Sequence, residues 1–252
     1  MARKTKKQER QEQELISEAL KRFKLCEDAE AEIRRESLID LKFRAGEQWE
    51  DNISNERRAS SRPCLTVNRL PQFIRQVTND QRMNRPQIRF AATDDDTLGI
   101  AKIREGMVRQ IQVSSNADVA YDTASDFQVT MGFGYIRIGT KYCDEDSFDQ
   151  EIVILPVKNP FAVYFDPNAK EIDYSDAEYA FITSDLRHDD FVEQYGEDKA
   201  PDSNLTSSGD EVLNWAGKDT VRVAEYWVVE KKPKTIYELS DGSVVDELPE
   251  GV

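Results

Sequence analysis

The repeat of apolar residues changes within residues 127–142, which read FQVTMGFGYIRIGTKY. Before Gly132 the apolar residues recur every three or four positions, which is the period of an amphipathic helix. From Tyr135 onward they alternate with polar or small residues, as on a strand with one buried face. Gly132 itself stands where helices commonly end in a left-handed residue. We therefore predict an α+β fold, with helices first and antiparallel strands afterwards, and not a doubly wound parallel sheet.

A long helical arm is predicted upstream, from about Lys7 to Phe43, because this stretch contains neither proline nor glycine. Its apolar stripe consists of Leu15, Ala19, Phe23, Cys26, Ala29, Ile33 and Leu41. A break in two near Glu36 and Ser37 is the alternative to one continuous helix. Because so narrow a stripe cannot bury itself, we expect the arm to dock on the body of the protein or on another chain. The other interpretation is a solvated, frayed helix.

Three further helices are predicted between Gly46 and the change of period. The first has Asn68 as its N-cap and Pro71 in its first turn, and it ends before Pro86. The next begins at the acidic residues 94–96, where carboxylates favour a helix N-terminus. The last follows Asn116 and ends at Gly132.

The strands are predicted from alternation of apolar and polar residues. They span residues 87–91, 135–142, 150–157, 162–165, 178–184, 221–229, 235–239 and 243–245. The acidic residues 144–146 join the second and third of these into a β-hairpin. A short helix over residues 190–195 and a polar loop over residues 201–210 complete the expected layout.

Charge is unevenly distributed along the 252 residues, whose net charge is −15. Residues 1–90 carry a net charge of +5, and the remaining residues carry −20. A negative field over the longer part repels a phosphate backbone, so we do not expect tight nucleic-acid binding there. DNA that passes without being held remains compatible with this charge. The basic part can still contact phosphate, an acidic partner or a neighbouring subunit.

Composition excludes several classes of protein. No stretch approaches the roughly 18 apolar residues of a membrane helix, and the charged N-terminus does not resemble a secretion signal. The three cysteines are widely spaced, which fits neither a disulfide framework nor a zinc site. His188 is the only histidine, and we expect it at the surface near a helix start.

Motifs that carry chemistry are incomplete in this sequence. A calcium loop from Asp144 has Asp149 where glycine is needed, and one from Asp166 has Ala177 where glutamate is needed. Gly132 and Gly134 begin a dinucleotide-like loop, but its third glycine is missing. We therefore predict no catalytic residue, no cofactor and no metal site. With 49 acidic residues, a carboxylate- or metal-dependent hydrolase stays open as an alternative.

One cluster of positive charge stands out in the structured part, formed by Arg75, Arg82, Arg85 and Arg89. Arg75 and Arg82 are seven residues apart and share a helix face. These arginines are candidates for contact with DNA phosphate or with the acidic flank of a neighbouring subunit. The alternative is that they are solvated and compensate Asp80 and the acidic strands.

Five segments, in this order, resemble the N-terminal half of portal proteins of short-tailed, podoviral bacteriophages. They read FRAGEQW (43–49), RPCLTVNRL (62–70), NRPQI (84–88), GFGYIR (132–137) and NPFAVYFDP (159–167). Each segment is modest alone, but their order and spacing make the resemblance specific. The matched positions have turn and cap roles, and the family carries no catalytic role at them.

The resemblance implies a structural head-to-tail connector in the virion, assembled in the host cytoplasm. Such proteins form homo-oligomeric rings, usually dodecamers, at one capsid vertex, together with capsid and scaffolding proteins. The terminase large subunit and the tail adaptor or head-completion proteins dock on the ring. Double-stranded DNA passes through it without sequence specificity during genome packaging and ejection.

The expected domain organisation is a helical N-terminal arm and linker over residues 1–62 and a wing-like α+β domain over residues 63–252. The loop-like residues 247–251 at the end favour a domain truncated at its C-terminal end. Besides the hydrolase, a second alternative to the portal interpretation is an adaptor protein whose helical arm binds a partner.

Overall fold

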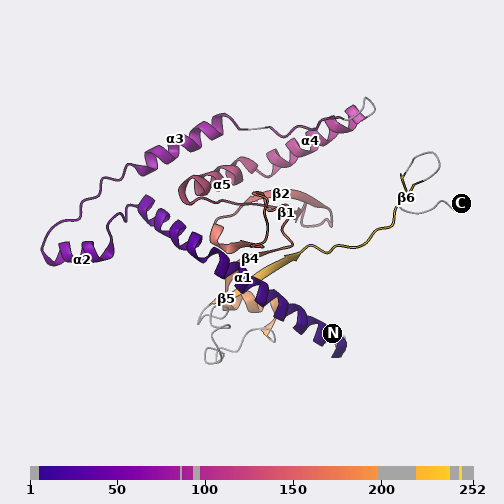
Figure 1. Ribbon diagram of the computed structural model, residues 1–252. Helices are drawn as coiled ribbons and strands as arrows, with labels where there is room; N and C mark the ends of the chain where they lie inside the picture. The colour runs from indigo at the N-terminus through magenta and orange to yellow at the C-terminus, as the bar shows by residue number, and fades with distance from the viewer. Residues whose placement is uncertain (1–5, 86, 93–96, 198–219, 239–243, 246–252) are drawn as a thin grey trace, which may run out of the picture. The chain divides into compact units, whose positions relative to one another are not determined.

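The computed structural model describes residues 6–85, 87–92, 97–197, 220–238 and 244–245. The helices are α1 (Lys6–Ala45), α2 (Asp51–Ala59), α3 (Leu70–Met83), α4 (Leu98–Ser114), α5 (Ala117–Met131) and α6 (His188–Tyr195). Most helices precede the strands in the chain, and the strand pairs are antiparallel, so the predicted α+β class is confirmed (Figure 1). The chain divides into two compact units, residues 1–164 and residues 165–252, which are described separately.

Helix α1 is one continuous helix of 40 residues, so the predicted alternative of a break near Ser37 is wrong. The hydroxyl of the buried Ser37 donates a hydrogen bond to the carbonyl oxygen of Met131 in α5, at 2.8 Å. Because this hydroxyl bonds to another helix, it does not compete for the backbone of its own. Phe23 and Cys26 are buried and α1 contacts α5, which confirms that the arm docks on the body.

The chain between α1 and α3 contains a helix that we did not predict. Gly46 ends α1 with a φ of +105°, a conformation that favours glycine. Helix α2 follows, with Asp51 in its first turn and Arg57 in its last, which suits the helix dipole. Arg57 also lies 4.8 Å from the ring of Trp49 and donates to the carbonyl oxygen of Pro63 at 3.0 Å. These local contacts favour a helix in a stretch of sequence that is mostly polar.

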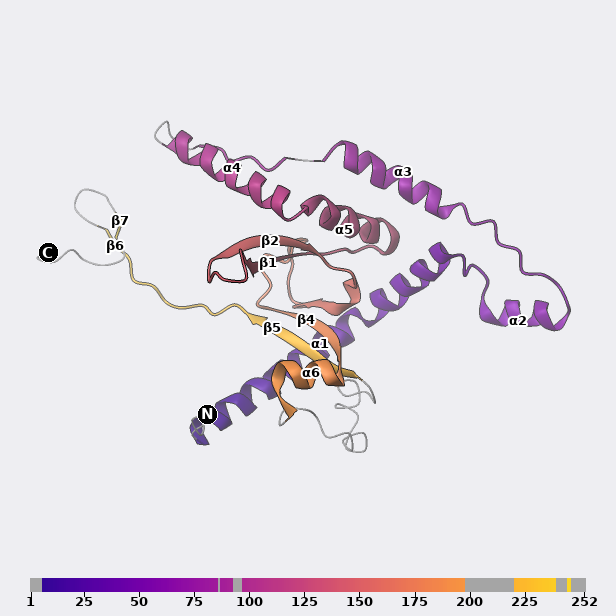
Figure 2. The same cartoon turned by 180° about the vertical axis from the view of Figure 1, so that it is seen from behind.

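Helix α5 is central to the first unit, because it contacts α1, α3, α4 and both strands of the hairpin. Ala117 and Ala120 of α5 form a small core with Ile154, against which Ile111 and Tyr121 pack. Figures 1 and 2 show α4 and α5 following one another, with α3 beside α5. The chain bends between α4 and α5 at Asn116, whose φ is +49°.

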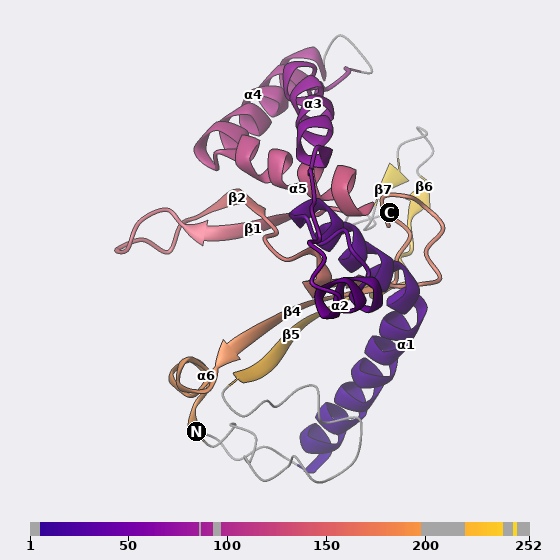
Figure 3. The same ribbon diagram turned by 90° about the vertical axis from the view of Figure 1, so that its left-hand side faces the viewer.

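The predicted helix end and β-hairpin are both confirmed. Gly132 follows α5 with a φ of +94° and serves as its C-cap. Strands β1 (Ile136–Tyr142) and β2 (Gln150–Pro156) pair antiparallel, from Ile136 opposite Pro156 to Tyr142 opposite Gln150. Figure 3 shows the end of this hairpin projecting away from α3, α4 and α5.

Two predictions between α2 and α4 need correction. Residues 87–91, expected as a strand, lie in an irregular, largely exposed segment. Helix α3 begins at Leu70 with Arg69 as N-cap, so Asn68 is not its N-cap. The Asn68 side chain instead accepts from the Leu70 amide at 3.2 Å and donates to the carbonyl oxygen of Arg44 at 2.7 Å. Pro71 lies in the first turn, as predicted.

The predicted acidic helix start at residues 94–96 and the predicted loop over residues 201–210 lie outside the described residues. The short helix η2 (Pro160–Ala162) ends the first unit, and β3 (Val163–Phe165) spans the boundary at residue 164.

The second unit is built on two long strands, β4 (Tyr179–Arg187) and β5 (Thr220–Val228), which pair antiparallel. The buried ring of Phe181 stacks on Tyr226, with 4.7 Å between ring centroids. A hydrogen bond from Arg222 lowers the pKa of Asp185 on the neighbouring strand. Helix α6 begins at His188, which is exposed as predicted. Strands β6 (Tyr237–Glu238) and β7 (Val244–Val245) form a separate small pair.

Candidate interaction surface at helices α3 and α5

The four candidate arginines lie along α3 and the segment that follows it. Arg75 is exposed on α3, and Arg82 lies in its last turn. Arg85 is half-buried just after the helix, and Arg89 is exposed in the extended segment beyond it. The structure brings Arg82 and Arg85 together at one cavity, whereas Arg75 and Arg89 do not line it.

Two carboxylates of α5 meet this pair of arginines. Asp122 accepts from Arg82 Nε at 2.9 Å and also from Arg85 Nη2, so it lies between two guanidinium groups. Arg85 also pairs with Asp118, one helical turn earlier on α5. Because α3 packs beside α5, these ion pairs link two helices of the first unit. The partners of Arg82 and Arg85 among the described residues are therefore on α5, and Asp80 is not one of them.

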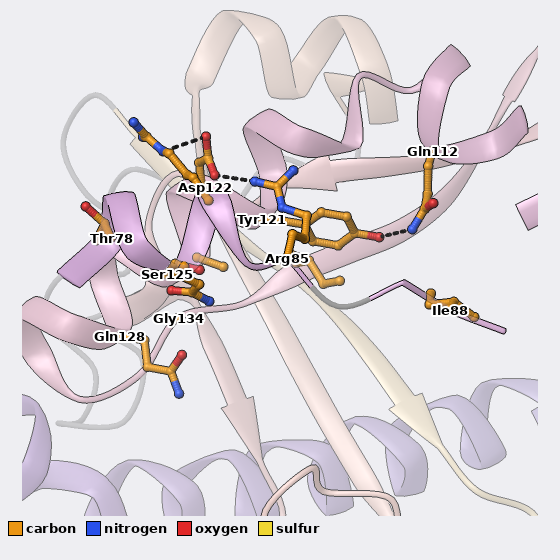
Figure 4. A pocket seen from close by; sticks show the side chains of 13 residues that line it. Thr78, Arg85, Ile88, Gln112, Tyr121, Asp122, Ser125, Gln128 and Gly134 are labelled. Atoms are coloured by element: carbon orange, nitrogen blue, oxygen red, sulfur yellow. Dashed lines mark hydrogen bonds and ion pairs between the residues drawn. The ribbon is translucent and has the colours of Figure 1, made fainter. Parts of the chain in front are cut away.

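A cavity of about 370 Å³ opens beside these ion pairs (Figure 4). Its apolar wall includes Ile88, Tyr121 and Ile136, and its polar wall includes both arginines. The Tyr121 hydroxyl accepts from Gln112 Nε2 at 3.2 Å, and the Arg85 guanidinium lies 5.5 Å from the Tyr121 ring. The cavity wall thus combines polar groups with a larger apolar part, which suits a protein side chain better than a small charged ion.

Gly134 forms part of the cavity wall and explains how closely β1 can approach α5. A Cβ atom at this position would lie 2.0 Å from the carbonyl oxygen of Ala124, which belongs to the backbone of α5. Any side chain here would force the helix and the strand apart. The glycine that precedes the strand in sequence is therefore required by packing, and not by a dinucleotide.

Electrostatics decide what this surface can bind. The two arginines and the two aspartates carry equal and opposite charge, so the site has no surplus positive charge for a phosphate group. The sequence pointed to the arginines but not to Asp118 and Asp122. Their spacing of four residues on one helix was the available signal, since it places both carboxylates on one face.

Within the described part of the chain, none of the helices combines the length and the apolar character needed to cross a membrane.

Comparison with known proteins identifies the family. A family model described as Phage P22-like portal protein matches residues 20–252. A portal protein of Acyrthosiphon pisum secondary endosymbiont phage 1 is 27% identical over 225 residues, which cover 84% of this chain. The chain spans 31% of the length of that relative. The resemblance found in the sequence is confirmed, because the family model covers well over half of the residues: the chain belongs to the Phage P22-like portal protein family.

Proposed function

We propose that this chain is a structural part of a portal ring in the virion, at one capsid vertex through which double-stranded DNA is packaged and ejected. The observation that carries the proposal is the match of residues 20–252 to the portal family. The ring is homo-oligomeric, with twelve subunits, and it assembles in the host cytoplasm. Its role is mechanical and not enzymatic.

The charge of the chain supports a conduit that does not retain DNA. The net charge is −15, and the excess of acidic over basic residues lies beyond residue 90. A surface of this sign repels phosphate and releases no counterions on contact with DNA, so duplex slides past without sequence-specific binding. The neutral ion-pair cluster of Arg82, Arg85, Asp118 and Asp122 fits the same picture, since its arginines are already paired.

The exposed apolar surface supports contacts with other chains. Helix α1 exposes Leu15, Ile16 and Leu20, and α4 exposes Ile103 and Met107. We assign residues 1–62 to an arm with its linker and residues 63–252 to the wing of the ring. The terminase large subunit, the tail adaptor and head-completion proteins, and the capsid and scaffolding proteins are the proposed partners of the assembled ring.

Arg75 and Arg89 are the proposed basic contacts of this surface, because both are exposed and lie outside the neutral cluster. Their proposed partner is DNA phosphate or the acidic flank of the next subunit.

Electron microscopy of the purified protein tests the proposal directly. We expect rings with a central hole and, in a binding assay with 30-base-pair duplex at about 150 mM salt, no tight complex. Monomers at every concentration tried, or turnover of a polymer substrate that is lost when a carboxylate is replaced, would contradict it. Replacing Arg75 and Arg89 with glutamine should lower ring yield or DNA passage, and unchanged values for both would remove these two residues from the proposal.

A further inference from the structure

The end of the β1–β2 hairpin presents an aromatic side chain among acids. We call residues 142–149 the hairpin tip. Phe148 is 95% exposed there, and Tyr142 is also exposed. The residues between them include Asp144, Glu145 and Asp146, all exposed. Transfer of so exposed a phenyl ring from water into an apolar cavity is favourable.

The hairpin tip cannot reach the α3–α5 cavity of its own chain. Ile136, at the start of β1, lines that cavity, whereas Tyr142 lies at the other end of the same strand. Six residues of strand separate the two by roughly 20 Å, at about 3.3 Å per residue. Figure 3 shows the hairpin end directed away from α3 and α5. A residue of the tip that enters such a cavity must therefore enter that of another molecule.

The cavity has the size and the walls that an aromatic side chain needs. Its volume is about 370 Å³, and an apolar cavity of about 150 Å³ already binds benzene. Ile88 and Ile136 provide apolar contact, while the guanidinium groups of Arg82 and Arg85 can lie against a ring face.

Charge complementarity indicates which molecule supplies the aromatic side chain. Beyond the neutral ion-pair cluster, α3, the segment after it and α4 carry further exposed basic side chains, namely Arg75, Arg89, Lys102 and Arg104. The hairpin tip carries four exposed carboxylates, on Asp144, Glu145, Asp146 and Asp149. Every copy of the chain thus has an acidic, aromatic projection and, at least one strand length away, a partly apolar cavity with exposed basic side chains on the elements around it. Two such unlike surfaces make a head-to-tail contact, which closes into a ring when the rotation between copies allows it.

We propose that the hairpin tip of one copy docks in the α3–α5 cavity of the next copy, with Phe148 entering the cavity. The tip carboxylates then face the basic side chains around it. This inference rests on the proposed ring, for which it names one subunit contact. A second copy of this chain is the occupant.

Cysteine crosslinking tests the contact, because Cys143 is naturally present and exposed in the tip. The variant Gln81→Cys places a second thiol on the cavity wall. Mild oxidation of the full chain should link copies into a ladder of oligomers, and the link should disappear in Gln81→Cys with Cys143→Ser. Gln13→Cys, on the exposed surface of α1, is the matched control and should give no ladder. Higher salt should reduce the yield, since the attraction between exposed charges is screened.

A second measurement removes the phenyl ring of Phe148. Phe148→Ala should weaken association of copies about tenfold or more, measured by sedimentation, because a buried aromatic anchor is lost. Phe148→Trp should restore association. Ile172→Ala is the matched control, because Ile172 is 99% exposed, lies outside the tip and should leave association unchanged.

The outcomes separate this contact from the proposed ring. Rings that form with wild-type yield in Phe148→Ala and give no Cys143 crosslink overturn the contact and leave the portal function standing. A Cys143 crosslink between copies in a protein that forms no rings supports the contact and contradicts the ring. A link between Cys143 and a different protein, with none between copies, also overturns the inference.

Discussion

Helices α4 and α5 are consecutive, of 17 and 15 residues, yet they contribute to folding in different ways. Helix α5 buries Ala117, Ala120 and Met131 and contacts three other helices. Helix α4, which the structure describes along its whole length, buries none of its residues, although Ile100, Ile103 and Met107 recur on it at helical spacing. Apolar residues at helical spacing therefore do not by themselves bury a helix. The elements packed around the helix decide whether those residues are buried within one copy of the chain.

Gly134→Ala should have the largest effect on stability, because it acts on the packing of α5 that distinguishes it from α4. The added Cβ would lie 2.0 Å from the carbonyl oxygen of Ala124, so α5 and β1 must separate. We expect a loss of about 4 kcal/mol in the free energy of unfolding, or failure to fold, because backbone atoms cannot move aside cheaply. Urea unfolding followed by circular dichroism measures it. A loss below about 1 kcal/mol would show that α5 is not held closely against the strand.

The two methionines of these helices sharpen the comparison. Met131, at the end of α5, is 3% exposed, whereas Met107 in α4 is 60% exposed. We expect Met131→Ala to lower the free energy of unfolding by about 2 to 3 kcal/mol, through lost burial and the cavity left behind. Met107→Ala is the matched control, and a change within about 0.5 kcal/mol is expected. Equal losses in the two variants would remove the distinction between the helices.

The ion pairs between α3 and α5 should have a smaller effect. Asp122 is 28% exposed and lies between two arginines, whereas Asp118 is 76% exposed. We expect Asp122→Asn to cost about 1 kcal/mol, since Arg82 and Arg85 then lose the carboxylate between them. Asp118→Asn should cost less than about 0.5 kcal/mol. Thermal unfolding at about 0.05 and 0.5 M salt checks this, because the Asp122 effect should shrink at the higher ionic strength.

The smallest effect has the opposite sign. Gly106 lies inside α4, and a Cβ atom added there would have no atom within 4 Å. Gly106→Ala should raise the free energy of unfolding by about 0.5 to 1 kcal/mol, because alanine favours the helix more than glycine. The same substitution is thus expected to stabilise α4 and to destabilise the contact between α5 and β1. A loss of stability in Gly106→Ala would mean that the face of α4 around Gly106 is packed within a single copy.

Local secondary structure was predictable wherever one residue type, such as glycine or proline, restricts the backbone conformation. Gly132 and Pro71 marked the end of one helix and the first turn of another, and alternation between residues 135 and 157 predicted both strands of the hairpin to within one residue of their bounds. Helix α2 was missed because contacts such as that of Arg57 with Trp49 stabilise it. Such contacts leave no helical repeat of apolar residues in the sequence. Residues 87–91 alternate like a strand, but a strand needs a partner, and no strand in the described part of the chain pairs with them.

The candidate site divides in the same way. The arginines were identified from their charge and spacing, because both are properties of consecutive residues. Their carboxylates on α5 are 33 to 40 residues further along, and only the packing of α3 beside α5 brings them together.

By itself, the sequence determined the fold class, the helical arm, the hairpin and the membership of the portal family, because periodicity, caps and motif order are written in neighbouring residues. The tertiary structure decided which apolar helix is buried, which carboxylates neutralise Arg82 and Arg85, and where a cavity opens. The physical reason is that burial and ion pairing depend on distances between segments far apart in the chain, and only chain packing sets those distances.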